Sequence, residues 1–132
     1  QVVLPLLETD IMDIIEAVWE EKLDTLDIKW SDKSCACVVM ASGGYPEKYE
    51  TGKVISGLDE NGQCEGAFVY HAGTKLEDGK FLTAGGRVLG ITAYGDTLKE
   101  ALDTAYKAVD TISFEKAHYR HDIGKKALSD LK

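Results

Sequence analysis

The chain has 132 residues, of which 44% are hydrophobic and 29% charged, and its formal net charge is −8. These totals fit one globular domain with a substantial core, and no apolar run reaches the roughly 20 residues of a membrane-spanning helix. The acidic balance excludes a nucleic-acid scaffold and docking on an anionic membrane, because both kinds of binding depend mainly on Lys and Arg, so we expect neither partner.

Residues 9–23 are predicted to form an amphipathic helix, because apolar residues recur there at helical spacing. Thr9 or Asp10 can cap its first turn. Residues 1–32 hold nine acidic residues against two lysines, which we interpret as a solvated helix face. The chain starts with Gln rather than Met and shows no signal peptide, so we expect it to be part of a longer protein.

The three cysteines are too few for a disulfide framework. Cys35 and Cys37 are two residues apart on a predicted strand and therefore face the same side. A structural zinc site needs four ligands, and only Cys64 and three histidines remain to complete one. We expect free thiols, which fit a cytoplasmic protein, and no metal site.

Short β-branched runs alternate with turn signals through the middle of the chain. The predicted strands are 34–41, 66–72 and 87–95, with a further short strand possible at 53–56. Residues 42–52 are rich in glycine and form a predicted loop. Asp78-Gly79, between apolar residues, is a strong hairpin signal.

Residues 96–112 form the clearest predicted helix. Thr97 and Glu100 have the spacing of a capping box. One face of this helix is apolar: Leu98, Ala101, Leu102, Ala105, Val109 and Ile112. Strands grouped between helices indicate the α+β class, with a mainly antiparallel sheet flanked by helices.

Catalytic motifs are missing from the sequence: neither a nucleophile elbow nor a phosphate loop ending in Gly-Lys-Ser/Thr occurs. His118 and His121 lie beside Asp122, but their spacing does not establish a metal site. We therefore assign no catalytic residue and no metal ligand.

The stretch from His71 to Gly90 combines glycines with Lys75, Lys80 and Arg87. Glycine lets backbone amides approach a ligand, and a guanidinium matches a phosphate in a planar fork. The same residues also fit a glycine-rich hairpin with solvated cations. The residues alone leave both readings open.

Several motifs together resemble the C-terminal portion of the phosphoribosylamine–glycine ligase family, of the ATP-grasp superfamily: "VLPLLETDI", "SGGYPEKYETGKVISG", "HAGTK", "GGRVLGITAYGDTLKEA" and "YRHDIG". The last helix and the strand before it also resemble the C-terminal module of biotin carboxylase. The resemblance implies a single C-terminal domain over residues 1–132. Residues 1–32 would then be a helical segment after an ATP-grasp domain that this chain lacks, and residues 33–132 the sheet-and-helix module.

The resemblance implies an activity for the parent enzyme. Such enzymes join glycine to 5-phosphoribosylamine with ATP and a Mg or Mn ion, in cytoplasmic purine biosynthesis. None of the family's ATP or metal ligands has a counterpart here, so we expect no cofactor on this part alone. By analogy, Arg87 and Lys75 are the expected ligands of the substrate phosphate, Lys75 being the weaker assignment. The alternatives are a non-catalytic binding module for a phosphorylated metabolite and a purely structural domain.

The tail carries four cations against one acid between residues 116 and 126. Arg120 and Asp122 are expected to form an ion pair that closes the tail onto the sheet, a structural role. Tyr45 and Tyr49 either line the cleft or pack locally.

Overall fold

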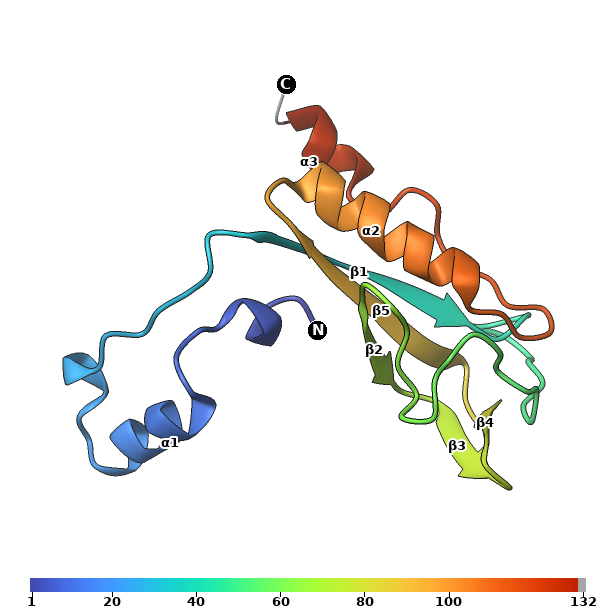
Figure 1. Cartoon of the computed structure of the whole chain (residues 1–132), viewed down its shortest axis with the longest axis horizontal. Helices are drawn as coiled ribbons and strands as arrows, with labels where there is room; N and C mark the ends of the chain where they lie inside the picture. Colours follow the sequence, from blue (N-terminus) through green and yellow to red (C-terminus); the bar gives the residue numbers. More distant parts are fainter. Residues whose placement is uncertain (131–132) are drawn as a thin grey trace.

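The computed structural model describes residues 1–130 and shows a three-stranded sheet packed against one long helix, with an N-terminal arm (residues 1–32) to one side (Figure 1). The helices are α1 (Ile11–Trp19), α2 (Leu98–Thr111) and α3 (Lys125–Asp130), with 3-10 turns at Leu4–Leu6 and Leu23–Thr25. The strands are β1 (Ser34–Ala41), β2 (Phe68–His71), β3 (Thr74–Glu77), β4 (Lys80–Thr83) and β5 (Arg87–Gly95). The predicted α+β class with an antiparallel sheet is confirmed.

The sheet has the order β1-β5-β2, and both pairings are antiparallel. Strands β3 and β4 form a separate two-stranded hairpin. Its turn residues Asp78 and Gly79 have φ angles of 49° and 72°, as a type I′ turn requires. The Asp-Gly signal therefore predicted this hairpin correctly.

Strand β1 is covered by α2 on one face only. Ala36, Val38 and Met40 are buried and pack in clusters with residues of α2. Cys37 and Val39 alternate with these residues along the strand. Cys37 is half-buried and Val39 is exposed. The apolar run of this strand predicts burial, whereas the face away from α2 is only partly covered. We call this second face the open face of the sheet.

Helix α2 begins as its capping box predicted. The hydroxyl of Thr97 accepts a hydrogen bond from the Glu100 amide at 3.2 Å, and the Glu100 carboxylate accepts one from the Asp96 amide at 3.0 Å. The N-cap residue is Thr97, so the Glu100 carboxylate binds the amide of the residue just before the N-cap. The predicted apolar face is the one that packs on the sheet, with these residues of the helix buried: Ala101, Leu102, Ala105, Ala108 and Val109.

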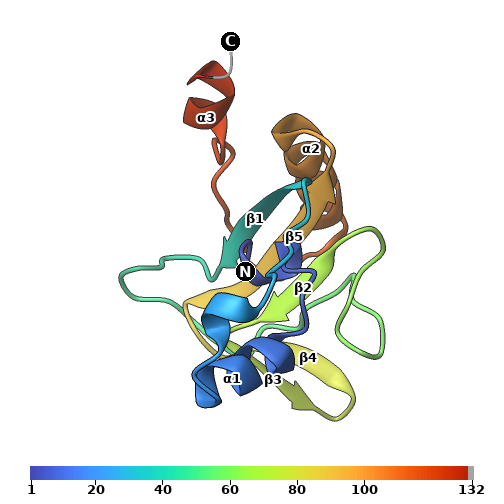
Figure 2. The same ribbon diagram turned by 90° about the vertical axis from the view of Figure 1, so that its left-hand side faces the viewer.

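The N-terminal arm meets the sheet mainly through its first residues. The hydroxyl of Thr92 donates to the carbonyl of Gln1 at 3.1 Å, and that of Tyr94 donates to the carbonyl of Pro5 at 2.9 Å. Helix α1 lies apart from α2, on the other side of the sheet (Figures 1 and 2). It ends at Trp19, earlier than predicted, because the chain turns at Glu21 with a φ of 56°.

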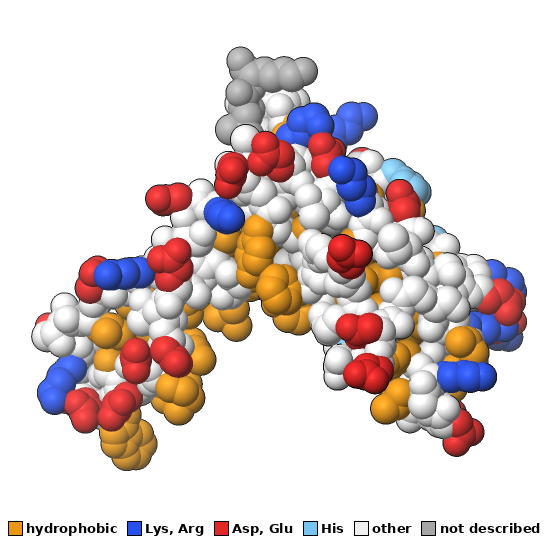
Figure 3. All heavy atoms as spheres, in the orientation of Figure 1, with side chains coloured by type: hydrophobic (Ala, Val, Ile, Leu, Met, Phe, Trp, Pro, Cys, Tyr) orange, Lys and Arg blue, Asp and Glu red, His pale blue; other side chains and the backbone are white. Residues whose placement is uncertain are grey.

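The apolar side of α1 faces solvent. None of the residues of α1, all of which are described, is buried, and Trp19 is 87% exposed. Figure 3 shows hydrophobic side chains along the lower side of the arm. The sequence correctly identified an amphipathic helix, but most of its apolar stripe is exposed, with Ile14 and Ala17 half-buried.

The tail returns along the edge of the sheet beside β1. Ala41 and His118 exchange two backbone hydrogen bonds, of 2.8 and 3.0 Å. The hydroxyl of Tyr106 in α2 donates to the carbonyl of Arg120 at 2.7 Å and accepts from the amide of Ile123 at 3.2 Å. Residues 53–56, predicted as a possible strand, contribute only isolated bridges to the described structure.

Candidate functional site

Two glycines of the His71–Gly90 stretch serve backbone packing. A Cβ added at Gly73 would lie 2.6 Å from the Cα of Gly85 and 2.7 Å from the carbonyl oxygen of Arg87. The hydroxyl of Ser42 also donates to the carbonyl of Gly85 at 2.8 Å. These backbone segments are therefore pressed together, and the amide of Gly73 already donates to the carbonyl of Arg87 at 2.8 Å.

Lys75 lies on the β3–β4 hairpin, outside the three-stranded sheet. Its ammonium group is 2.6 Å from the carboxylate of Glu77, and both side chains are about half exposed. Exposed pairs of this kind are weak, but the carboxylate still offsets the charge that Lys75 would present to an anion.

Arg87 lies at the start of β5, where a bulge sets the direction of its side chain. Met40 of β1 pairs with Leu89, but Ala41 of β1 pairs with Arg87. Val88 therefore has no paired residue on β1. A bulge of this kind re-aims the neighbouring side chains. Because paired residues share a face, Arg87 shares the face of Ala41, which is the open face.

Arg87 borders a cavity of about 290 Å³ at this end of the open face. The lining residues are Val39, Ala41, Tyr45, Pro46, Arg87, His118, Tyr119 and Arg120. The described lining contains two guanidinium groups and an imidazole but no carboxylate. In a chain whose net charge is −8, this local arrangement favours an anion. We call it the cation-lined cavity.

Tyr45 borders the cation-lined cavity and also packs locally, against Tyr49. A Cβ added at Gly86 would overlap the ring of Tyr45 and approach the ring of Tyr49. The two tyrosine rings are tilted against each other with centroids 6.1 Å apart. Gly86 therefore gives Tyr45 the space it needs beside Arg87.

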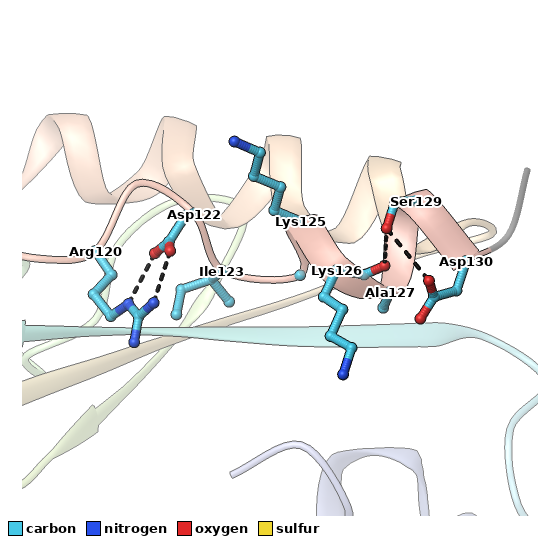
Figure 4. A pocket seen from close by; sticks show the side chains of 9 residues that line it. Arg120, Asp122, Ile123, Lys125, Lys126, Ala127, Ser129 and Asp130 are labelled. Carbon is cyan, nitrogen blue, oxygen red and sulfur yellow. Dashed lines mark hydrogen bonds and ion pairs between the residues drawn. The ribbon is translucent and has the colours of Figure 1, made fainter.

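A second hollow, of about 820 Å³, lies beside α3 (Figure 4). Lys125 and Lys126 line it, but their side chains point in opposite directions, so they do not converge on one anion. Arg120 lines this hollow too, paired there with the carboxylate of Asp122.

Arg120 and Asp122 form the predicted ion pair, but both residues belong to the tail, so the pair does not join the tail to the sheet as expected. Arg120 donates from Nε to Oδ1 at 2.8 Å and from Nη2 to Oδ2 at 2.7 Å (Figure 4). These hydrogen bonds hold the pKa of the Asp122 carboxyl below its ordinary value and raise the pKa of the guanidinium. The pair fixes the direction of the Arg120 fork.

Residues 1–130 contain no group of three His, Cys, Asp or Glu side chains that could hold a metal ion. The ring of His121 packs against that of Tyr119 at a tilt of 48°, with centroids 4.6 Å apart. The three cysteines are free and half-buried, and burial raises the pKa of the Cys35 and Cys64 thiols. This makes those two thiols poorer nucleophiles.

Among the described residues, no helix is both long and apolar enough to cross a membrane.

The sequence did not predict that His118 and Arg120 lie beside Arg87. The bridge between Ala41 and His118 joins segments far apart in the chain, and no local pattern encodes it. The available signal was the excess of cations between residues 116 and 126 in an otherwise acidic chain.

Comparison with known proteins gives consistent matches. The family model described as "Phosphoribosylglycinamide synthetase, C domain" matches residues 35–126. The phosphoribosylamine–glycine ligase of Caldanaerobacter subterraneus subsp. tengcongensis is 53% identical over 93% of this chain and 29% of its own length. The bifunctional purine biosynthetic protein purD of Dictyostelium discoideum is 48% identical over 99% of this chain and 16% of its own length.

A solved structure has the same fold. The crystal structure of phosphoribosylamine–glycine ligase from Thermotoga maritima superposes with a TM-score of 0.70 at 31% identity, covering 92% of this chain and 29% of that one. The chain thus spans less than a third of the length of these relatives. With the family model matched over most of its length, the chain belongs to the phosphoribosylglycinamide synthetase C-domain family.

Proposed function

We propose that the chain is the C-terminal domain of an ATP-dependent ligase that joins glycine to 5-phosphoribosylamine and so makes glycinamide ribonucleotide for purine biosynthesis. The family model and the names of the relatives support this proposal. Because the chain covers less than a third of those relatives, catalysis requires the remaining domains. Three free thiols support a cytoplasmic location.

In this proposal residues 1–32 follow the ATP-grasp domain, and residues 33–132 cover the active site. The exposed apolar side of α1 and the open face of the sheet support that arrangement, because both are surfaces that another domain can bury. The domain then provides a lid and substrate contacts, and proton chemistry belongs elsewhere in the enzyme.

Arg87 is the proposed ligand of the substrate's 5-phosphate. The observation that carries this assignment is its position at the cation-lined cavity, on a bulge that directs it to the open face. A guanidinium can donate two parallel hydrogen bonds to a phosphate and so fix the orientation of the sugar. Lys75 remains the weaker candidate, because Glu77 offsets its charge.

ATP supplies the phosphoryl group that activates glycine in the whole enzyme, and a Mg or Mn ion accompanies it. The described residues do not fit that metal, since residues 1–130 offer no cluster of suitable ligands. We therefore assign ATP and metal binding to the preceding domains and derive no step through them here.

The test uses the full-length ligase that contains this chain, with phosphate release measured while each substrate is varied in turn. Wild type should need ATP, glycine and phosphoribosylamine together. Arg87→Ala should raise the apparent KM for phosphoribosylamine roughly 10- to 100-fold, the range expected for a shielded charged hydrogen bond. The KM values for ATP and glycine should stay unchanged.

Lys107→Ala is the matched control, because Lys107 lies on α2 and does not line the cation-lined cavity. Lys75→Ala should have a smaller effect than Arg87→Ala. A normal KM for phosphoribosylamine in Arg87→Ala would contradict the phosphate assignment. Turnover without phosphoribosylamine or glycine would contradict the ligase itself.

A further inference from the structure

We propose that Arg120 is the second guanidinium of the phosphate site, so that the phosphate lies between Arg87 and Arg120. This inference rests on the proposed function and names a ligand that the family comparison does not assign. It also replaces Lys75 by Arg120 as the partner of Arg87.

The first supporting observation is a row of residues across the sheet. Ala41 pairs with Arg87 on β5 and forms a bridge with His118 in the tail. Neighbouring strands lie roughly 4.8 Å apart, so the backbones of Arg87 and His118 are about 10 Å apart. The strand position between them holds Ala41, whose side chain is small, and all three residues border the cation-lined cavity.

The second observation is that three consecutive residues of the tail, His118, Tyr119 and Arg120, border the same cavity as Arg87. The bridge to Ala41 places this segment beside β1, and the hydroxyl of Tyr119 donates to the carboxylate of Asp110 on α2 at 3.1 Å, which holds the segment there. Arg120 also borders the hollow beside α3, where Figure 4 shows its guanidinium against the carboxylate of Asp122.

The third observation is that Arg120 is already oriented. Asp122 accepts hydrogen bonds from Nε and Nη2, and no described residue accepts one from Nη1. The carbonyl of Arg120 is held by the hydroxyl of Tyr106. The carboxylate of Asp122 offsets part of the charge of Arg120, as Glu77 does for Lys75, but the Nη1 group remains available to donate to a ligand. Pre-orientation of this kind lowers the entropic cost of binding.

The chemistry of the cavity fits a phosphate monoester. Its terminal oxygens carry close to two negative charges at neutral pH, which one guanidinium balances only in part. Two guanidinium groups on opposite sides can donate to different oxygens, and the imidazole of His118 can add a further hydrogen bond. Tyr45 and Pro46 provide an apolar wall for the attached sugar.

The experiment measures how strongly the full-length ligase distinguishes a phosphate from its absence. Calorimetry gives Kd for glycinamide ribonucleotide and for the same compound without its phosphate, and the ratio is the phosphate discrimination. Arg120→Gln should lower this ratio about 10-fold or more and leave the Kd of the dephosphorylated compound unchanged. Arg87→Gln should do the same, and Lys107→Gln should change neither.

Asp122→Asn separates a phosphate contact from a merely structural role, because it breaks the ion pair but keeps the charge of Arg120. Under the proposal it loses the benefit of pre-orientation but keeps the contact, so the discrimination should fall clearly less than in Arg120→Gln. If Asp122→Asn lost as much discrimination as Arg120→Gln, the inference would be overturned. If Arg120→Gln reduced the folded fraction, Arg120→Lys would replace it in the experiment. Lysine keeps the positive charge but lacks the planar guanidinium fork, so the phosphate discrimination should still fall.

The failure of this inference is distinct from that of the proposed function. Loss of discrimination in Arg87→Gln but not in Arg120→Gln would overturn only the role of Arg120. Normal discrimination in both variants would overturn the phosphate site as a whole. Equal weakening of both compounds in Arg120→Gln would also refute a phosphate contact.

Discussion

Tyr106→Phe tests how the tail is held against α2. The hydroxyl of Tyr106 donates to the carbonyl of Arg120 at 2.7 Å and accepts from the amide of Ile123 at 3.2 Å. The substitution removes both hydrogen bonds and keeps the ring, which packs against Tyr119. It therefore loosens the segment that positions Arg120 without opening a cavity.

Each lost hydrogen bond should cost about 0.5–1.5 kcal/mol, so the free energy of unfolding should fall by about 1–3 kcal/mol. Urea unfolding of the 132-residue chain measures this change, with an unchanged slope expected. Hydrogen exchange reports the local effect, because the amide of Ile123 loses its acceptor and should exchange faster.

Tyr70→Phe is the matched control, since Tyr70 is half-buried on β2 and none of the described residues hydrogen-bonds its hydroxyl. Its effect should stay within about 0.5 kcal/mol. If Tyr106→Phe were no more destabilising than Tyr70→Phe, or if exchange at Ile123 were unchanged, the attachment of the tail would be wrong as described.

Three further predictions follow from the site and the arm. Gly86→Ala should displace the ring of Tyr45 and weaken binding of glycinamide ribonucleotide to the full-length ligase; calorimetry showing unchanged affinity would refute that packing. Hydrogen bonds from Arg120 lower the folded-state pKa of Asp122, so their stabilisation is present above the unfolded pKa and lost as pH falls through the lowered value. In Arg120→Gln an NMR titration should find this pKa raised towards its ordinary value, and an unchanged pKa would contradict the pair. The 132-residue chain should self-associate through α1, and Ile15→Asp should reduce this; light scattering independent of concentration in the wild type would exclude it.

Features set by neighbouring residues could be predicted from the sequence. The Asp78-Gly79 turn has the dihedral angles that its residue types favour, and Thr97 and Glu100 cap α2 through contacts within one turn. The pairing of Arg120 with Asp122 is local in the same way. In each case the sequence contains both partners within a few positions.

Features that depend on distant pairings could not be predicted. The bulge opposite Met40 and Ala41 decides which face Arg87 joins, and period-2 alternation alone does not show it. The bridge from Ala41 to His118 brings the tail to the site. The glycines at 73 and 85 resembled a ligand loop in sequence, but they permit close approach of two backbone segments.

The most direct test of the central claim is a crystal structure of the full-length ligase with glycinamide ribonucleotide bound. The account predicts the phosphate in the cation-lined cavity, with its oxygens about 2.7–2.9 Å from the guanidinium nitrogens of Arg87. A phosphate held entirely by other domains, with Arg87 turned towards solvent, would contradict the proposed role of this domain.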